Sequence, residues 1–214
     1  MRPMADYEPP AAGSPSAGGQ ASSAAAPARE LVHNPTIRLH GTVDDAMLDT
    51  FLDGVARAEG GQGPVAVEVC TLGGDAEVGR RMVLEVGLAR ERLPGRRLIF
   101  IGKTIVYSAG VTIMSAFPHE DRFVTSDGVF LIHCRQLEKT VELSGPMRGS
   151  MPLVESLCRQ LKLGCEMEIQ GFRRLIAGSE IEMEEVLDKG LHNWYLTAED
   201  ALERRLIAGI IDCD

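Results

Sequence analysis

The chain has 214 residues, enough for one domain of ordinary size and a tail. Its 22 basic and 31 acidic residues give a net charge of −9, and the basic residues are spread out, which argues against nucleic acid as a partner. The five cysteines form no CxxC pair, so we expect a reducing compartment and no structural zinc site. No apolar run approaches a membrane span of roughly 18 residues, and no signal peptide is recognised at the N-terminus, so we expect a cytoplasmic protein.

Residues 1–30 differ in composition from the rest of the chain. Ala, Gly, Ser and Pro dominate them, and little large apolar surface is present to offset the entropy of ordering. We expect a disordered tail there, either a simple tether or a flexible gate. Residues 31–214 are expected to form the folded domain.

Short apolar runs alternate with helical patterns from Thr36 onwards. The runs predict four strands, at 37–39, 65–69, 98–101 and 129–132. Helical patterns follow the first three runs, and the first of these helices opens at Asp44 or Asp45. Such alternation predicts parallel pairing with right-handed crossovers, in which ligands collect beyond the carboxyl ends of strands.

The last third of the chain is predicted to be helical. Apolar residues recur every four positions from Leu153 to Cys165, and Gly178 is a plausible cap at the end of that long helix. Two further helix starts carry capping-box signatures: Ser179 with Glu182, and Thr197 with Asp200.

Ser108 is a candidate nucleophile at the turn after the third predicted strand. Ala109 and Gly110 follow it and leave space around its hydroxyl, which attack on a carbonyl requires. A serine at such a turn is also a common helix N-cap, so the local sequence favours neither role decisively.

His133 ends the fourth predicted strand and is the candidate base. A lone histidine at a strand end can equally be a structural residue. His119 and His192 are competitors, but both lie in polar turns or beside helix starts. The remaining histidines, His33 and His40, belong to the start of the chain, far in sequence from a nucleophile.

The glycine pair Gly73-Gly74 follows the second predicted strand. Glycine lets backbone N–H groups face a ligand, so the pair is a candidate oxyanion loop, although it could be an ordinary turn. The phosphate-binding patterns GxGxxG and GxxxxGK[ST] are absent. GxSxG is absent too, because Val106 stands at its first glycine position, which argues against the α/β-hydrolase fold.

A carboxylate would complete a Ser-His-Asp triad. Asp188 is the candidate that we favour, and Glu184, Glu185 and Asp200 are its rivals.

Taken together, residues 36–212 resemble the proteolytic subunit of the Clp protease, a serine peptidase of the crotonase-like superfamily. Residues 37–44 are similar to that family's opening strand and turn, and residues 71–74, Thr-Leu-Gly-Gly, stand at its glycine-pair loop. Ser108 falls on the nucleophile and His133 on the base, 25 residues later (133 minus 108), and residues 195–201 match the closing segment.

The resemblance implies an α/β fold of the crotonase and Clp type, a ββα spiral of repeated strand-helix units with a protruding helical handle at about 135–178. It implies catalysis by Ser108, His133 and Asp188, with Gly74 and Ala109 as oxyanion donors and with no metal or organic cofactor. Asp188 requires a one-residue shift against the family. Partners would be unfolded polypeptides, further copies in a seven-membered ring that can stack in pairs, and an unfoldase ATPase.

Several positions depart from the family pattern. Leu72 replaces a proline, Ala109 replaces a methionine, and the segment from Gly102 to Ser108 is about two residues longer. After His133 the glycine-rich strand that lines the family's substrate groove is not recognisable, and about nine extra residues precede the long helix.

Two alternative functions remain open from these departures. One is a paralogue that keeps the ring-forming fold but has lost productive triad geometry. The other is an acyl-CoA enzyme of the crotonase type, in which paired N–H groups hold a thioester enolate; this leaves the serine and the histidine without roles.

Overall fold

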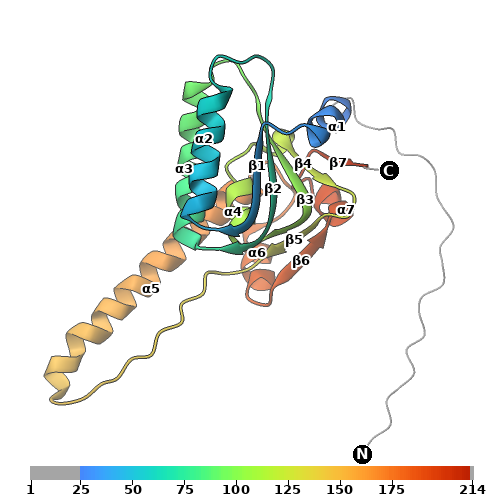
Figure 1. Ribbon diagram of the computed structural model, residues 1–214. Helices are drawn as coiled ribbons and strands as arrows, with labels where there is room; N and C mark the ends of the chain where they lie inside the picture. Colours follow the sequence, from blue (N-terminus) through green and yellow to red (C-terminus); the bar gives the residue numbers. More distant parts are fainter. Residues whose placement is uncertain (1–24, 213–214) are drawn as a thin grey trace, which may run out of the picture.

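The computed structural model describes residues 25–212, which form a seven-stranded sheet with helices packed around it (Figure 1). The strands are β1 Ile37–Val43, β2 Val65–Gly74, β3 Leu98–Tyr107, β4 Arg122–Thr125, β5 Val129–Ile132, β6 Trp194–Thr197 and β7 Gly209–Ile211. The helices are α1 Ala25–His33, α2 Asp45–Ala58, α3 Ala76–Arg92, α4 Ala109–Met114, α5 Met147–Ile176, α6 Met183–Gly190 and α7 Ala198–Glu203, and a 3₁₀ turn, η1, spans His119–Asp121.

The sheet has the predicted parallel topology. Its main path is β1-β2-β3-β4-β7, with every neighbouring pair parallel. Strand β5 pairs parallel with the end of β3, and β6 pairs antiparallel with β5. Helices α2 and α3 lie side by side on one face of the sheet, α2 against β1 and α3 against α4, as right-handed crossovers require (Figure 1). The mixed α/β fold predicted from the sequence is therefore confirmed.

Capping side chains fix where several helices begin. Asp44 accepts a hydrogen bond from the N–H of Met47 and starts α2 at Asp45. Thr197 and Asp200 form the predicted capping box of α7.

The predicted capping box between Ser179 and Glu182 was wrong. Glu182 is the N-cap of α6 without a side-chain cap bond. The hydroxyl of Ser179 instead donates to Ile176 O at the end of α5 and accepts from the N–H of Ile181. Ser179 therefore closes the preceding helix instead of opening the next one.

Strands β2 and β3 extend beyond their predicted ends and carry the chain into the candidate site. Their register shifts by two residues, because Val69 pairs with Gly102 and Thr71 pairs with Val106. The two extra residues that the resemblance suggested between Gly102 and Ser108 coincide with this shift. Thr104 within it has φ +56°, a conformation that non-glycine residues rarely adopt.

Strands β4, β6 and β7 were not predicted from the sequence. They have only three or four residues each, and β4 begins with Arg122, whose charge does not resemble a core position. Nevertheless Arg122 is only 1% exposed. Tertiary contacts, not local pattern, therefore define these strands.

The expected tail boundary at residue 30 is corrected by helix α1. This helix begins at Ala25, so residues 25–30 are helical, and residues 1–24 lie outside the described part of the chain. Val32 is buried in a small cluster with Ile99, Ile101 and other side chains on one side of the sheet. Lys103 Nζ also donates to Val32 O at 3.0 Å. These contacts supply the burial that the tail's composition alone lacks.

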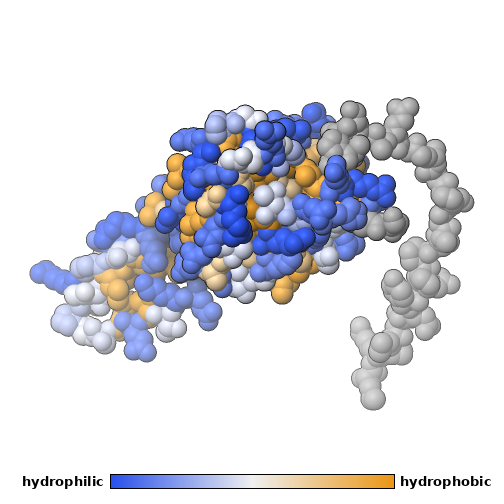
Figure 2. Space-filling model, turned by 45° about the horizontal axis from the view of Figure 1, so that its top comes forward, coloured by the Kyte–Doolittle hydropathy of each residue, from blue (hydrophilic) through white to orange (hydrophobic). Residues whose placement is uncertain are grey.

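Helix α5 projects away from the sheet, and residues 133–146 run along it without forming a strand or helix (Figure 1). We call residues 133–176 the handle. Figure 2 shows apolar surface on this projection. The exposed large apolar side chains there are Leu137, Leu143, Met147, Met151, Leu153, Leu161 and Leu163. No helix within residues 25–212 is long and apolar enough to cross a membrane.

Candidate functional site

The carboxyl ends of β2, β3 and β5 meet at one cavity of about 400 Å³. Gly74, Ser108 and His133, the last residues of these strands or the residues directly after them, all line it. The N–H of Ser108 donates to Leu131 O at 2.9 Å, so β5 directly holds the turn that carries the serine. The structure thus brings together three residues that the sequence placed at successive strand ends.

Ser108 occupies a strained turn between β3 and α4. Its backbone has φ +54° and ψ −113°, outside the conformations favoured for residues other than glycine. Its side chain makes no N-cap hydrogen bond, so the helix-capping role does not apply. Strain of this kind costs about 1–3 kcal/mol and concentrates at functional sites, including the strand-to-helix turn of nucleophilic serines.

Only glycine fits at position 73, because the backbone there lies against Ser108. Its φ is +103°, and a Cβ there would lie 2.8 Å from Ser108 Cβ and 3.3 Å from Ser108 Oγ. The N–H of Gly73 donates to Thr71 Oγ1 at 2.9 Å, and this hydroxyl in turn donates to Gly41 O at 2.5 Å. A side chain at position 73 would therefore displace the candidate nucleophile.

The two candidate oxyanion donors flank the serine within the cavity. Gly74 ends β2 with φ +154°, and a Cβ there would collide with the backbone of Val43. Ala109 follows Ser108 directly and is the first residue of α4, where N–H groups have no partner within the helix. Their role as oxyanion donors stays a prediction.

The ring of His133 is oriented by a backbone carbonyl. Its Nδ1 lies 2.7 Å from Cys134 O. Because a carbonyl only accepts, this bond requires the hydrogen on Nδ1, which leaves Nε2 with the lone pair that a base needs. The segment after His133 is itself tied down, since Cys134 N–H donates to Gly190 O and Arg135 N–H donates to a carboxylate oxygen of Glu168.

The competing histidines lie elsewhere. His119 lies in η1, and its Nδ1 is 3.1 Å from a carboxylate oxygen of Glu120. His40 contacts Glu68 beside a different cavity, between β1, β2 and β3. Neither these two histidines nor His192, the other competitor, lines the cavity that contains Ser108.

No hydrogen bond joins Asp188 to His133 within residues 25–212, although α6 lies against the segment after His133, where Cys134 N–H donates to Gly190 O. Asp188 and Glu184 line a separate hollow on α6, and within residues 25–212 the Asp188 carboxylate forms no ion pair or side-chain hydrogen bond. Glu185 is bound by Lys189 and Arg204, and Asp200 caps α7. Asp188 as the third triad member stays a prediction, which a substitution described below tests.

The side chains that close the cavity were not predicted from the sequence. They come from α3, from the segment after His133 and from the C-terminal end of α5: Arg80, Arg135, Met167, Glu168, Phe172, Arg174 and Leu175. The amphipathic pattern of the long helix was visible, but its position against the site was not.

Glu77 lies beside this lining and binds two of its arginines. Burial alone would raise the pKa of Glu77, yet hydrogen bonds from Arg135 and Arg80 outweigh it and lower that pKa.

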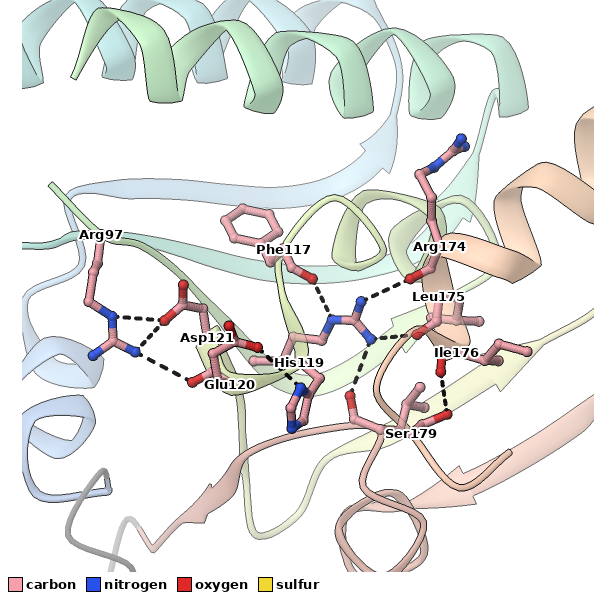
Figure 3. Close-up of polar contacts among 11 residues, drawn as sticks. Arg97, Phe117, His119, Glu120, Asp121, Arg174, Leu175, Ile176 and Ser179 are labelled. Carbon is pink, nitrogen blue, oxygen red and sulfur yellow. Dashed lines mark hydrogen bonds and ion pairs between the residues drawn. The ribbon is translucent and has the colours of Figure 1, made fainter. Parts of the chain in front are cut away.

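Arg122 anchors the end of α5 beside the site (Figure 3). Its guanidinium donates to Phe117 O at 2.8 Å and to Leu175 O at 2.6 Å, with longer bonds to Arg174 O and Leu206 O. Burial lowers the pKa of Arg122 to about 10, which still leaves it charged at neutral pH. One buried cation therefore satisfies four carbonyls from separate parts of the chain and fixes the helix end that lines the cavity.

The described residues contain no group of three or more His, Cys, Asp or Glu side chains arranged to hold a metal ion.

Comparison with known proteins identifies the fold. The structure is similar to that of a mutant of ClpP1 from Listeria monocytogenes, with a TM-score of 0.65 and 17% sequence identity over 86% of this chain and 94% of that chain. No protein-family model and no curated protein matches the sequence. The chain has a ClpP-like fold.

Proposed function

We propose that this chain is a Clp-type serine peptidase that hydrolyses peptide bonds of unfolded polypeptides. The observation that carries the proposal is Ser108 in a strained turn, free of any capping bond, in the same cavity as His133. A strained backbone conformation that serves no structural contact is typical of a residue positioned for catalysis.

The proposed reaction uses the side chains and backbone groups already described. His133 Nε2 takes the proton of Ser108 Oγ as the oxygen attacks the peptide carbonyl. The N–H groups of Gly74 and Ala109 stabilise the oxyanion of the tetrahedral intermediate. The intermediate collapses with transfer of the proton to the leaving amine, and water then attacks the acyl-enzyme to release the second product and restore the serine.

We further propose that the chain acts in a ring of its own copies, with the sites facing an interior chamber and an unfoldase ATPase as partner, in the cytoplasm. The exposed apolar side chains of the handle support self-association, because monomers rarely expose contiguous surface of this kind. A native mass measurement tests the ring. We expect the mass of about seven subunits or a multiple of it, and the mass of a monomer would contradict the proposal.

The second candidate function is a ring subunit with an impaired site. The observation that favours it is that, within residues 25–212, the His133 ring is hydrogen-bonded to the Cys134 carbonyl and not to Asp188. In this reading the Cys134 carbonyl holds the histidine without the charge that would stabilise an imidazolium.

Peptide hydrolysis by the wild type and by Ser108→Ala distinguishes the two functions. The active peptidase loses at least about 10⁴-fold in kcat/KM on this substitution. Ser126→Ala, which removes a hydroxyl from an exposed turn, serves as the control and keeps full activity. A folded wild type that hydrolyses no faster than Ser108→Ala supports the impaired subunit instead.

A further inference from the structure

The cavity beside Ser108 and His133 has a charge opposite to that of the whole chain. The protein carries −9 overall, yet three arginines line this cavity: Arg80, Arg135 and Arg174. Glu168 is the one acidic residue in the lining. A site of this sign favours a negatively charged ligand even on an acidic protein.

Two of these arginines are already engaged by contacts within the protein. The guanidinium groups of Arg80 and Arg135 both donate to Glu77, which lies outside the cavity lining. Glu168 accepts the backbone N–H of Arg135. Three arginines and these two carboxylates leave one surplus positive charge.

Arg174 carries that surplus. Within residues 25–212 its guanidinium forms no ion pair or hydrogen bond, whereas its backbone is held firmly, since Arg122 donates to Arg174 O at 3.3 Å and to Leu175 O at 2.6 Å. Figure 3 shows the Arg174 side chain pointing away from its own carbonyl and from Leu175. A fixed backbone with an unpaired guanidinium at a cavity wall is suited to bind a carboxylate.

The rest of the lining suits an acidic side chain with an aliphatic stem. Val111, Met167, Phe172 and Leu175 supply apolar surface in the same cavity as the serine and Arg174. Arg174 is itself exposed at the rim of this lining, so the apolar surface would contact the stem of the ligand while the charged pair stays partly hydrated.

We propose that Arg174 is a specificity-determining residue that binds a carboxylate of the peptide substrate, so that the site prefers Glu or Asp close to the scissile bond. The proposal rests on the proposed peptidase function, because Ser108 and His133 define where that bond lies.

The test uses fluorogenic peptides that differ only by Glu or Gln at one position near the cleaved bond. We expect the wild type to cleave the Glu peptide about 10-fold better in kcat/KM, because a charged pair is stronger than a neutral hydrogen bond. Arg174→Gln is expected to abolish this preference and Arg174→Lys to keep part of it. Arg173→Gln is the matched control: the residue is exposed on the same helix turn, does not line the cavity and carries the same charge.

Two further measurements identify which carboxylate is bound and separate substrate preference from catalysis. Peptides with a free or amidated C-terminus show whether Arg174 reads a side chain or a chain end, and only a preference for the acidic side chain supports the proposal. Anisotropy of labelled Glu and Gln peptides bound to Ser108→Ala measures the preference without catalysis, so a failure of the peptidase reaction leaves this readout intact. Equal affinity for both peptides, or a preference unchanged in Arg174→Gln, overturns the proposal.

Discussion

Ser108 and His133 follow neighbouring strands, but their surroundings differ in kind. The serine turn is enclosed by the core: Val106 and Ala109 are buried, and Gly73 lies against Ser108. The histidine is followed by residues 134–146, which belong to no helix or strand and depend on a few hydrogen bonds to α5 and α6. The nucleophile is therefore positioned by packing, and the base is positioned by hydrogen bonds between the segment that follows it and helices α5 and α6.

The largest expected effect comes from Arg122→Met, which removes the anchor of the handle's end. Four carbonyls lose a buried charged donor, so we expect the free energy of unfolding to fall by about 3 kcal/mol or more. Denaturant unfolding measures it. Arg173→Met, at an exposed position on the same helix, is the control and should change stability by less than about 0.5 kcal/mol. If Arg122→Met also lowered the free energy of unfolding by less than about 0.5 kcal/mol, other contacts would hold the end of the handle.

The next effect tests the packed side of the site. Gly73→Ala places a methyl group 2.8 Å from Ser108 Cβ and a side chain at φ +103°. We expect the rate of reaction of Ser108 with a fluorophosphonate to fall about 100-fold, equivalent to about 2.7 kcal/mol. Gly87→Ala on α3 is the matched control, because a Cβ there meets nothing within 4 Å and alanine favours a helix by about 1 kcal/mol. Equal labelling rates in the two variants would show that Gly73 does not position the serine.

A smaller effect concerns the sheet beneath the serine. Lys103 Nζ lies 2.7 Å from Glu68 Oε2, and the Glu68 side chain is 4% exposed. Burial would raise the pKa of Glu68, but hydrogen bonds and charge from Lys103 and His40 outweigh it and lower that pKa. A lowered folded-state pKa stabilises the protein above the unfolded value of 4.5, and this contribution disappears as the pH falls through the folded pKa.

Glu68→Gln should therefore lower the free energy of unfolding by about 2 kcal/mol at pH 7, a value between those typical of exposed and of buried ion pairs. Thermal unfolding from pH 7 down to pH 3 measures it, and the gap between wild type and variant should narrow on acidification. A gap that widens as the pH falls would contradict the assigned sign.

The smallest expected effect belongs to Asp188→Asn. If the Cys134 carbonyl alone orients His133, kcat/KM changes by less than about 2-fold. If Asp188 is the third triad member in the working enzyme, the loss approaches about 10⁴-fold. Peptide hydrolysis by the variant decides between them, and Asp200→Asn is not a usable control because Asp200 caps α7.

The difference between the two sides of the site also explains what the sequence could predict. Ser108, His133 and Gly73-Gly74 stand at the ends of apolar runs, so the alternation of strands and helices was enough to place them at one edge of a parallel sheet. Arg174 and Glu168 come from the handle, whose docking depends on Arg122 some fifty residues away. Contacts of that range leave no local pattern. The same holds for the Cys134 carbonyl, because a backbone group carries no signal in the sequence.

Fluorophosphonate labelling with mapping of the modified residue tests the central claim most directly. The account predicts that wild-type protein is labelled at Ser108 and not at Ser115, whose hydroxyl already donates to Thr112 O in the same cavity. Labelling should disappear in Ser108→Ala and slow at least about 100-fold in His133→Ala, since the base activates the nucleophile. A folded wild type that is not labelled, or labelling that is unchanged in His133→Ala, would contradict the serine–histidine pair.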